Sequence, residues 1–144
     1  MDISYSIERS SKGKFNRVII NTEDGKFDSG LECYCYYRLK QEKIEFDFQV
    51  KHILQESKKI NKENQYIENG RVRRTIAAIT LTPDFETVKG DTLYIIDTKG
   101  QQTQQNVLRF KMLEYKLLEE AKLYKILLPQ SQQEVQEVIK KLLS

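Results

Sequence analysis

The sequence predicts one α/β domain, in which helices cover a central β-sheet. Apolar residues recur at helical spacing in residues 29–42, 103–121 and 131–143, and strand patterns lie between these segments. A chain of 144 residues suits one domain with one hydrophobic core. No repeat or low-complexity linker divides it, so we expect a single domain over residues 1–144. Its core should span about residues 26–128, followed by the C-terminal helix at about 131–143.

The first half of the chain shows a polar N-terminal segment, a helix and a strand. The first 26 residues are polar, with a strand indicated at residues 16–21. A helix is predicted from about residue 29 to 42; its apolar stripe consists of Leu31, Tyr34, Cys35 and Leu39. Residues 44–53 alternate with period two and predict a half-buried strand, whose inward face carries Ile44, Phe46, Phe48 and Val50. Residues 57–70 read as a loop or a hairpin tip.

The second half adds strands and two helices. Residues 73–88 read as one long strand or as two strands broken near Pro83. A turn at residues 89–91 leads into a strand at 92–100. The helix at 103–121 buries Phe110, Leu113, Leu117 and Ala121, and the strand at 124–128 ends before Pro129. The last helix begins with a capping box, Ser131 and Glu134, and its apolar stripe is Val135, Val138, Ile139, Leu142 and Leu143.

Composition favours a water-soluble globular protein. Hydrophobic residues make up 39% and charged residues 31% of the chain, and the net charge is +3. No apolar run approaches the ~20 residues that a membrane span needs, and the N-terminus lacks the apolar core of a signal peptide. We therefore expect a cytoplasmic protein without membrane contact. The two cysteines, Cys33 and Cys35, and the single histidine, His52, argue against a disulfide and against a zinc site.

Positive charge gathers between residues 58 and 74. Six basic residues stand here against Glu63 and Glu68; they are Lys58, Lys59, Lys62, Arg71, Arg73 and Arg74. Such a segment is either a solvated loop or a phosphate-contacting one, and the charge alone does not decide between the two.

Residues 82–100 carry polar side chains where a buried strand would be apolar. Asp97 and Lys99 are two apart on one strand and share a face. The turn at residues 89–91 would return the strand of Asp84 to their side. Two carboxylates and an ammonium group would then meet in one pocket. Carboxylate oxygens of this kind suit Mg²⁺, which binds one or two carboxylates together with waters and phosphate oxygens.

These residues and their order resemble the signature of the PD-(D/E)XK nuclease superfamily. Pro83 and Asp84 are followed, after twelve intervening residues, by Asp97, Thr98 and Lys99. The superfamily shares a core of helix, three strands, helix and strand, which is the order predicted above. The resemblance thus implies a restriction-endonuclease-like α/β fold, a mixed sheet flanked by helices in αβββαβ order, with one further C-terminal helix.

A closer resemblance covers roughly residues 26–121. The stretch "KFDSGLE" before a tyrosine-rich helix is similar to the opening of small phage-associated nucleases filed as a domain of unknown function. Holliday-junction resolvases share the same superfamily core. In the small nucleases the helical glutamate, here Glu32, joins the active site. Arg109 and Lys111 fall at basic positions of the following helix, and Gln49 falls where a strand often carries glutamine.

The resemblance implies a Mg²⁺-dependent endonuclease that hydrolyses DNA, including branched or junction DNA, with Mn²⁺ as a substitute metal. Asp84, Asp97 and the Thr98 carbonyl would hold the metal, Glu32 would contribute directly or through water, and Lys99 would position the attacking hydroxide. DNA phosphates would be contacted by basic residues, namely Arg109, Lys111, Arg71, Arg73, Arg74, Lys58 and Lys59.

Other interpretations of the same residues stay open. Ser29 and Glu32 also fit a capping box, in which the glutamate only caps a helix. Asp97 and Lys99 also fit a surface ion pair, and we expect Glu86 to be exposed. The alternative function is a non-catalytic DNA-binding or protein-interaction module on the same fold. Nothing in the sequence decides between a monomer and a homodimer.

Overall fold

The computed structural model describes residues 8–12, 18–60, 75–98 and 102–144. Lys99 therefore lies outside the described residues, as do three of the predicted DNA contacts, Arg71, Arg73 and Arg74.

Three helices and eleven short strands make up the described part of the chain. They are β1 (Glu8–Lys12), β2 (Val18–Thr22), β3 (Gly25–Phe27), α1 (Gly30–Gln41), β4 (Asp47–Phe48), β5 (His52–Gln55), β6 (Lys58–Lys59), β7 (Thr75–Ile76), β8 (Ile79–Leu81), β9 (Phe85–Lys89), β10 (Thr92–Ile96), α2 (Gln104–Glu119), β11 (Leu123–Leu127) and α3 (Gln132–Leu143). None of the described helices is both long and apolar enough to cross a membrane.

The central sheet has four strands in the order β11-β10-β9-β4. Strands β4, β9 and β10 pair antiparallel, whereas β10 and β11 run parallel. The parallel pair needs a crossover, and α2 provides it. Along the chain the order is α1, three sheet strands, α2, β11 and α3, so the predicted α/β class and element order are confirmed.

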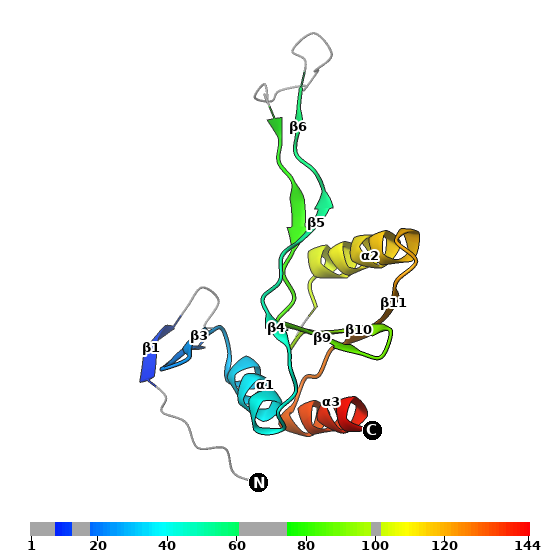
Figure 1. The fold of residues 1–144 in the computed structure, drawn as a ribbon. Coiled ribbons are helices and arrows are strands. Elements are labelled where there is room, and N and C mark those ends of the chain that lie inside the picture. Colours follow the sequence, from blue (N-terminus) through cyan, green and yellow to red (C-terminus); the bar gives the residue numbers. More distant parts are fainter. Residues whose placement is uncertain (1–7, 13–17, 61–74, 99–101) are drawn as a thin grey trace.

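Helices cover both faces of this sheet (Figure 1). On one face, α1 and α3 pack against β9 and β10, where Phe85 and Ile96 are fully buried. On the other face, α2 packs with Phe110 and Leu113 against Ile95. Because side chains alternate along a strand, the neighbours Ile95 and Ile96 serve opposite layers. Strand β10 is thus the centre of the domain.

The helix at residues 29–42 is confirmed, with Ser29 as its N-cap and Leu39 fully buried. In the other two helices, the predicted apolar stripe is wrong at one residue each. Ala121 lies beyond the end of α2, at φ +54, and is exposed. Leu143, at the end of α3, is 55% exposed. Both lie at helix termini, where the stripe runs past the part of the helix that faces the sheet.

The single strand predicted at residues 44–53 is also wrong. Its alternation of half-buried and exposed side chains is present. However, Gln49 adopts φ +56, and the chain turns there from β4 in the central sheet to β5 in another sheet. The period-two alternation correctly predicted which side chains face inward, but it could not predict that the chain changes its partner strand.

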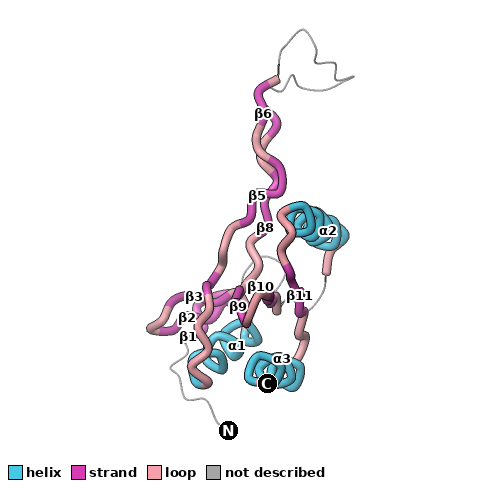
Figure 2. Tube along the Cα trace, turned by 45° about the vertical axis from the view of Figure 1, so that its right-hand side comes forward, coloured by secondary structure: helices cyan, strands magenta, loops and turns pink. Residues whose placement is uncertain are grey.

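A two-stranded arm leaves the central sheet between β4 and β9 (Figures 1 and 2). Strand β5 pairs with β8, and β6 pairs with β7, both antiparallel. The break near Pro83 is confirmed, because β8 belongs to the arm and β9 to the central sheet. Both strands of the arm therefore run directly into the central sheet. A separate small sheet, β1-β2-β3, packs on α1 through Ile20, Phe27 and Cys33.

Candidate functional site

Asp84 and Asp97 flank the open end of the β9–β10 hairpin. Ile96 pairs with Phe85 in the antiparallel register, so the next residues outward, Asp97 and Asp84, stand opposite each other. Directly opposed residues of an antiparallel pair point to the same face, with Cα atoms about 4.5–5.5 Å apart. Both are buried, Asp97 completely. The structure thus brings together the two carboxylates that the sequence singled out.

Thr98 fixes the orientation of the Asp84 carboxylate. The backbone N–H and the side-chain hydroxyl of Thr98 both donate to Asp84 Oδ2, each at 2.8 Å. Because both donors bind the same oxygen, they hold this side of the carboxylate in place. Within the described part of the chain, the other oxygen, Oδ1, accepts no hydrogen bond. One side of this carboxylate is therefore anchored, while the other can serve a ligand.

Glu32 comes to this site from the first turn of α1. Ser29 Oγ accepts a hydrogen bond from the Glu32 backbone N–H at 3.1 Å and caps the helix. The Glu32 carboxylate accepts from the Asp28 backbone N–H at 2.7 Å and from Gln49 Nε2 at 3.2 Å. The capping interpretation is therefore correct for Ser29, but the glutamate side chain also reaches away from its own helix and towards the residues that precede the arm.

Gln49 connects Glu32 with Asp84. Its side chain donates to Glu32, and its backbone N–H donates to the Asp84 carbonyl at 2.9 Å. The left-handed backbone at Gln49 is what allows one residue to do both, because it turns the chain at the end of β4. The glutamine noted in the sequence is thus part of the site, and the arm begins directly after it.

The carboxylates of Glu32 and Asp84 interact electrostatically. Burial, followed by the negative charge of Asp84, raises the pKa of Glu32 from its ordinary value to about 7, although the hydrogen bonds from Asp28 and Gln49 oppose the shift. Burial also raises the pKa of the Cys35 thiol, with added contributions from Asp84 and Glu32. These mutual effects locate Glu32 and Asp84 in one low-dielectric region beside α1.

The available ligands suit a small divalent cation that keeps several water ligands, rather than a metal ion whose ligands all come from the protein. No group of three His, Cys, Asp or Glu residues that could hold a metal ion occurs within the described ranges. Asp84 and Asp97 offer two carboxylates, and Mg²⁺ commonly takes one or two together with waters and phosphate oxygens. The residues therefore fit Mg²⁺ or Mn²⁺, with Glu32 better placed to act through a water molecule than as a third direct ligand.

The predicted basic residues lie in different surroundings. Lys58 and Lys59 are exposed on β6 of the arm, Arg109 is half-buried on α2, and Lys111 is exposed on α2. Residues that are two positions apart in a helix differ in direction by about 200°, so Arg109 and Lys111 point to different sides of α2.

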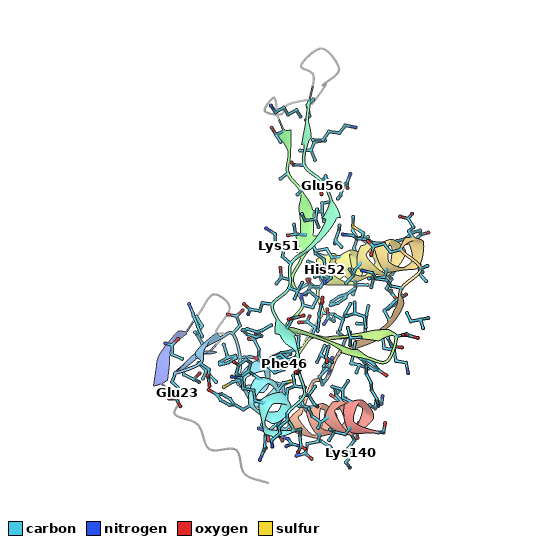
Figure 3. All side chains as sticks on the ribbon, viewed as in Figure 1. Glu23, Phe46, Lys51, His52, Glu56 and Lys140 are labelled. Atoms are coloured by element: carbon cyan, nitrogen blue, oxygen red, sulfur yellow. The ribbon has the colours of Figure 1, made fainter. Side chains whose placement is uncertain are left out.

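One pair of residues was missed from the sequence. Glu86, expected to be exposed, is only 7% exposed and is hydrogen-bonded to Nε2 of His52. His52 begins β5 of the arm, and Figure 3 shows it at the root of the arm beside α2. The signal was present, since Glu86 shares a strand face with Asp84 and the only histidine follows Gln49 by three residues.

The pKa of Glu32 gives a testable pH dependence. A carboxyl whose pKa rises from 4.5 to about 7 on folding stabilises the protein fully below pH 4.5, and this stabilisation is lost as the pH rises through 7. The wild type should therefore lose stability relative to Glu32→Gln between pH 4.5 and 7, by at most about 3 kcal/mol. Urea unfolding at several pH values in EDTA measures the difference, with Glu45→Gln, at an exposed position, as the control. A Glu32 carboxyl that titrates near 4.5 by NMR would contradict the assigned surroundings.

Comparison with known proteins identifies a family but no characterised relative. No curated protein and no solved structure matches the chain. A family described as "Protein of unknown function (DUF1064)" matches residues 11–133. This range includes Glu32, Gln49, Asp84 and Asp97, and it covers most of the chain. The protein therefore belongs to the DUF1064 family.

Proposed function

We propose that this protein is a Mg²⁺-dependent endonuclease that hydrolyses phosphodiester bonds in DNA. The observation that carries the proposal is that Asp84 and Asp97, both buried, directly adjoin Phe85 and Ile96, the last pair at the open end of the β9–β10 hairpin. Two buried carboxylates at one end of a hairpin repel each other, and such like-charge clusters are characteristic of functional sites. The αβββαβ order and the resemblance to the PD-(D/E)XK signature support a restriction-endonuclease-like core.

In this proposal, Asp84 and Asp97 hold the cation together with the backbone carbonyl of Thr98. A bound divalent ion would lower the pKa of a water molecule and neutralise charge on the attacked phosphate. Thr98 holds the Asp84 carboxylate in a fixed orientation through its two hydrogen bonds. Such prior positioning matters because a misplaced ligand costs activity even when it is present.

Glu32 and Lys99 act on the attacking water. Glu32, with a pKa of about 7, exists in both protonation states near neutral pH and can accept a proton from a water molecule. Gln49 holds one of its oxygens, which restricts the direction of the carboxylate. Lys99 follows Thr98 directly in the sequence. Its ammonium group is assigned to positioning the hydroxide and stabilising the transition-state charge.

The arm is assigned to holding the DNA backbone. A two-stranded β-ribbon is an element that fits the major groove of DNA. Lys58 and Lys59 expose two positive charges on it, and its strands lead to Gln49 on one side and to Asp84 on the other. DNA held along the arm would therefore lie next to the carboxylates. Arg109 is assigned a further phosphate contact.

Substitution of the site should separate cleavage from binding. Asp97→Asn removes a metal ligand, so Mg²⁺-dependent cleavage should vanish while DNA binding is kept. Asp91→Asn makes the same change in the exposed turn at the other end of the hairpin and should cut like the wild type. Lys99→Met should lower the rate by ~10²–10³. The readout is cleavage of labelled duplex, flap, nicked and four-way-junction DNA in Mg²⁺, Mn²⁺ or EDTA. If Asp97→Asn cuts as fast as Asp91→Asn, the nuclease proposal fails.

Salt dependence should reveal the role of the arm. The double variant Lys58→Ala/Lys59→Ala should bind DNA more weakly, and its slope of log affinity against log salt should fall by about 2, one for each lost phosphate contact. Lys140→Ala/Lys141→Ala removes two neighbouring exposed lysines from α3, which Figure 3 shows far from the arm residues Lys51 and Glu56. Titration of fluorescent DNA with each double variant at several salt concentrations measures these slopes. Equal slopes for the two double variants would show that the arm lysines do not contact DNA.

A further inference from the structure

Helix α2 has a second apolar face that no described residue covers. Its inner face is buried, with Phe110, Leu113 and Leu117 in the core. On its outer side, Leu108 is 59% exposed, Tyr115 74% and Leu118 64%. Scattered apolar residues are normal on a surface, but these three lie together on one helix opposite its core face. This outer face, defined by Leu108, Tyr115 and Leu118, is the candidate contact surface.

A groove runs along this face between α2 and β5. It has a volume of about 690 Å³, and Ile53 and Leu54 form its wall on the arm side. The Lys116 ammonium donates to the Ile53 carbonyl at 2.9 Å and ties the two walls together at the groove's edge. The groove is therefore a fixed part of the surface, bounded by elements that carry regular structure.

The charges on this face are arranged symmetrically about Tyr115. Lys111 lies four residues before it and Glu119 four residues after it, and both are exposed. Residues four apart share a helix face. If a second α2 lies antiparallel with Tyr115 on the two-fold axis, each Lys111 stands opposite Glu119 of the other copy. In the same register Met112 stands opposite Leu118, so this apolar pair also coincides, while Leu108 lies beyond the paired segment.

The geometry points to this face as a homodimer interface, in which two α2 helices pack antiparallel about Tyr115. A contact with two-fold symmetry must be complementary to itself, and the pairing of Lys111 with Glu119 provides that complementarity. Nucleic acid fits the face less well, because the groove carries no excess of positive charge: three glutamates line it against two lysines, Lys111 and Lys116. The occupant is therefore a second copy of this chain.

The dimer deepens the proposed function. It would give one assembly two active sites and two arms, which suits cleavage of both strands of a duplex or junction. That consequence rests on the proposed nuclease activity. The interface itself does not, because it is formed by the exposed apolar residues and the spaced charges of α2.

Exchange of the paired charges tests the register. In Lys111→Glu, two glutamates would face each other at each contact, and in Glu119→Lys, two lysines would. Each single variant should raise the dimer dissociation constant about tenfold or more at low ionic strength. A 1:1 mixture of the two should form a heterodimer, and the double variant Lys111→Glu/Glu119→Lys should return to the wild-type constant. Analytical ultracentrifugation and native mass spectrometry, without DNA or metal, measure these masses.

Two further variants complete the experiment. Tyr115→Ala removes the residue on the axis and should raise the dissociation constant at least as much as the single charge changes. Lys26→Glu, at an exposed position on β3, matches the charge change away from α2 and should have no effect. A wild type that stays monomeric at every concentration overturns the proposal, and so does a dimer that these charge exchanges leave unchanged. Because cleavage is not the readout, failure of the nuclease proposal would leave this result interpretable.

Discussion

The register of the β9–β10 hairpin is the constraint on which the site depends. The pairing of Phe85 with Ile96 places Asp84 opposite Asp97. A slip of one residue would send one carboxylate to the other face of the sheet. The tight turn helps to fix this register, because Gly90 adopts φ +61, a conformation that glycine accepts without strain. Packing on both faces of β10 fixes it further, through Ile95 on one side and Ile96 on the other.

The site concentrates negative charge where burial makes it costly. Glu32, Asp84 and Asp97 are all below 8% exposed. Hydrogen bonds from backbone and side-chain donors offset part of this cost at Glu32 and Asp84; these donors come from Asp28, Gln49 and Thr98. Burial and the charge of Asp84 raise the pKa of Glu32, because both disfavour its ionised form. A divalent ion between the carboxylates would offset part of their mutual repulsion, which is why the electrostatics and the metal assignment support each other.

Much of the fold could be predicted from the sequence, because its helices and strands follow regular apolar spacing. The meeting of the two strands at one end was also predictable, since it needs only a hairpin turn near Gly90. The exact register was not: the structure has a two-residue turn with Lys89 paired to Thr92, whereas the predicted three-residue turn at residues 89–91 would have placed Asp84 opposite Ile96. The arm was not, because the alternation in residues 44–53 continues through the change of sheet at Gln49. The contact of Glu86 with His52 depends on that same change of partner strand, so the sequence could indicate that Glu86 shares a face with Asp84 but not that His52 lies beside it.

The most direct test of the metal assignment is an anomalous-scattering measurement on crystals grown with Mn²⁺. The account predicts one strong peak between the carboxylates of Asp84 and Asp97, within about 2.5 Å of an oxygen from each, and no such peak in crystals of Asp97→Asn. It also predicts a water molecule between that peak and Glu32. Carboxylates that face opposite sides of the sheet, or Mn²⁺ bound only elsewhere in well-ordered wild-type crystals, would contradict the account.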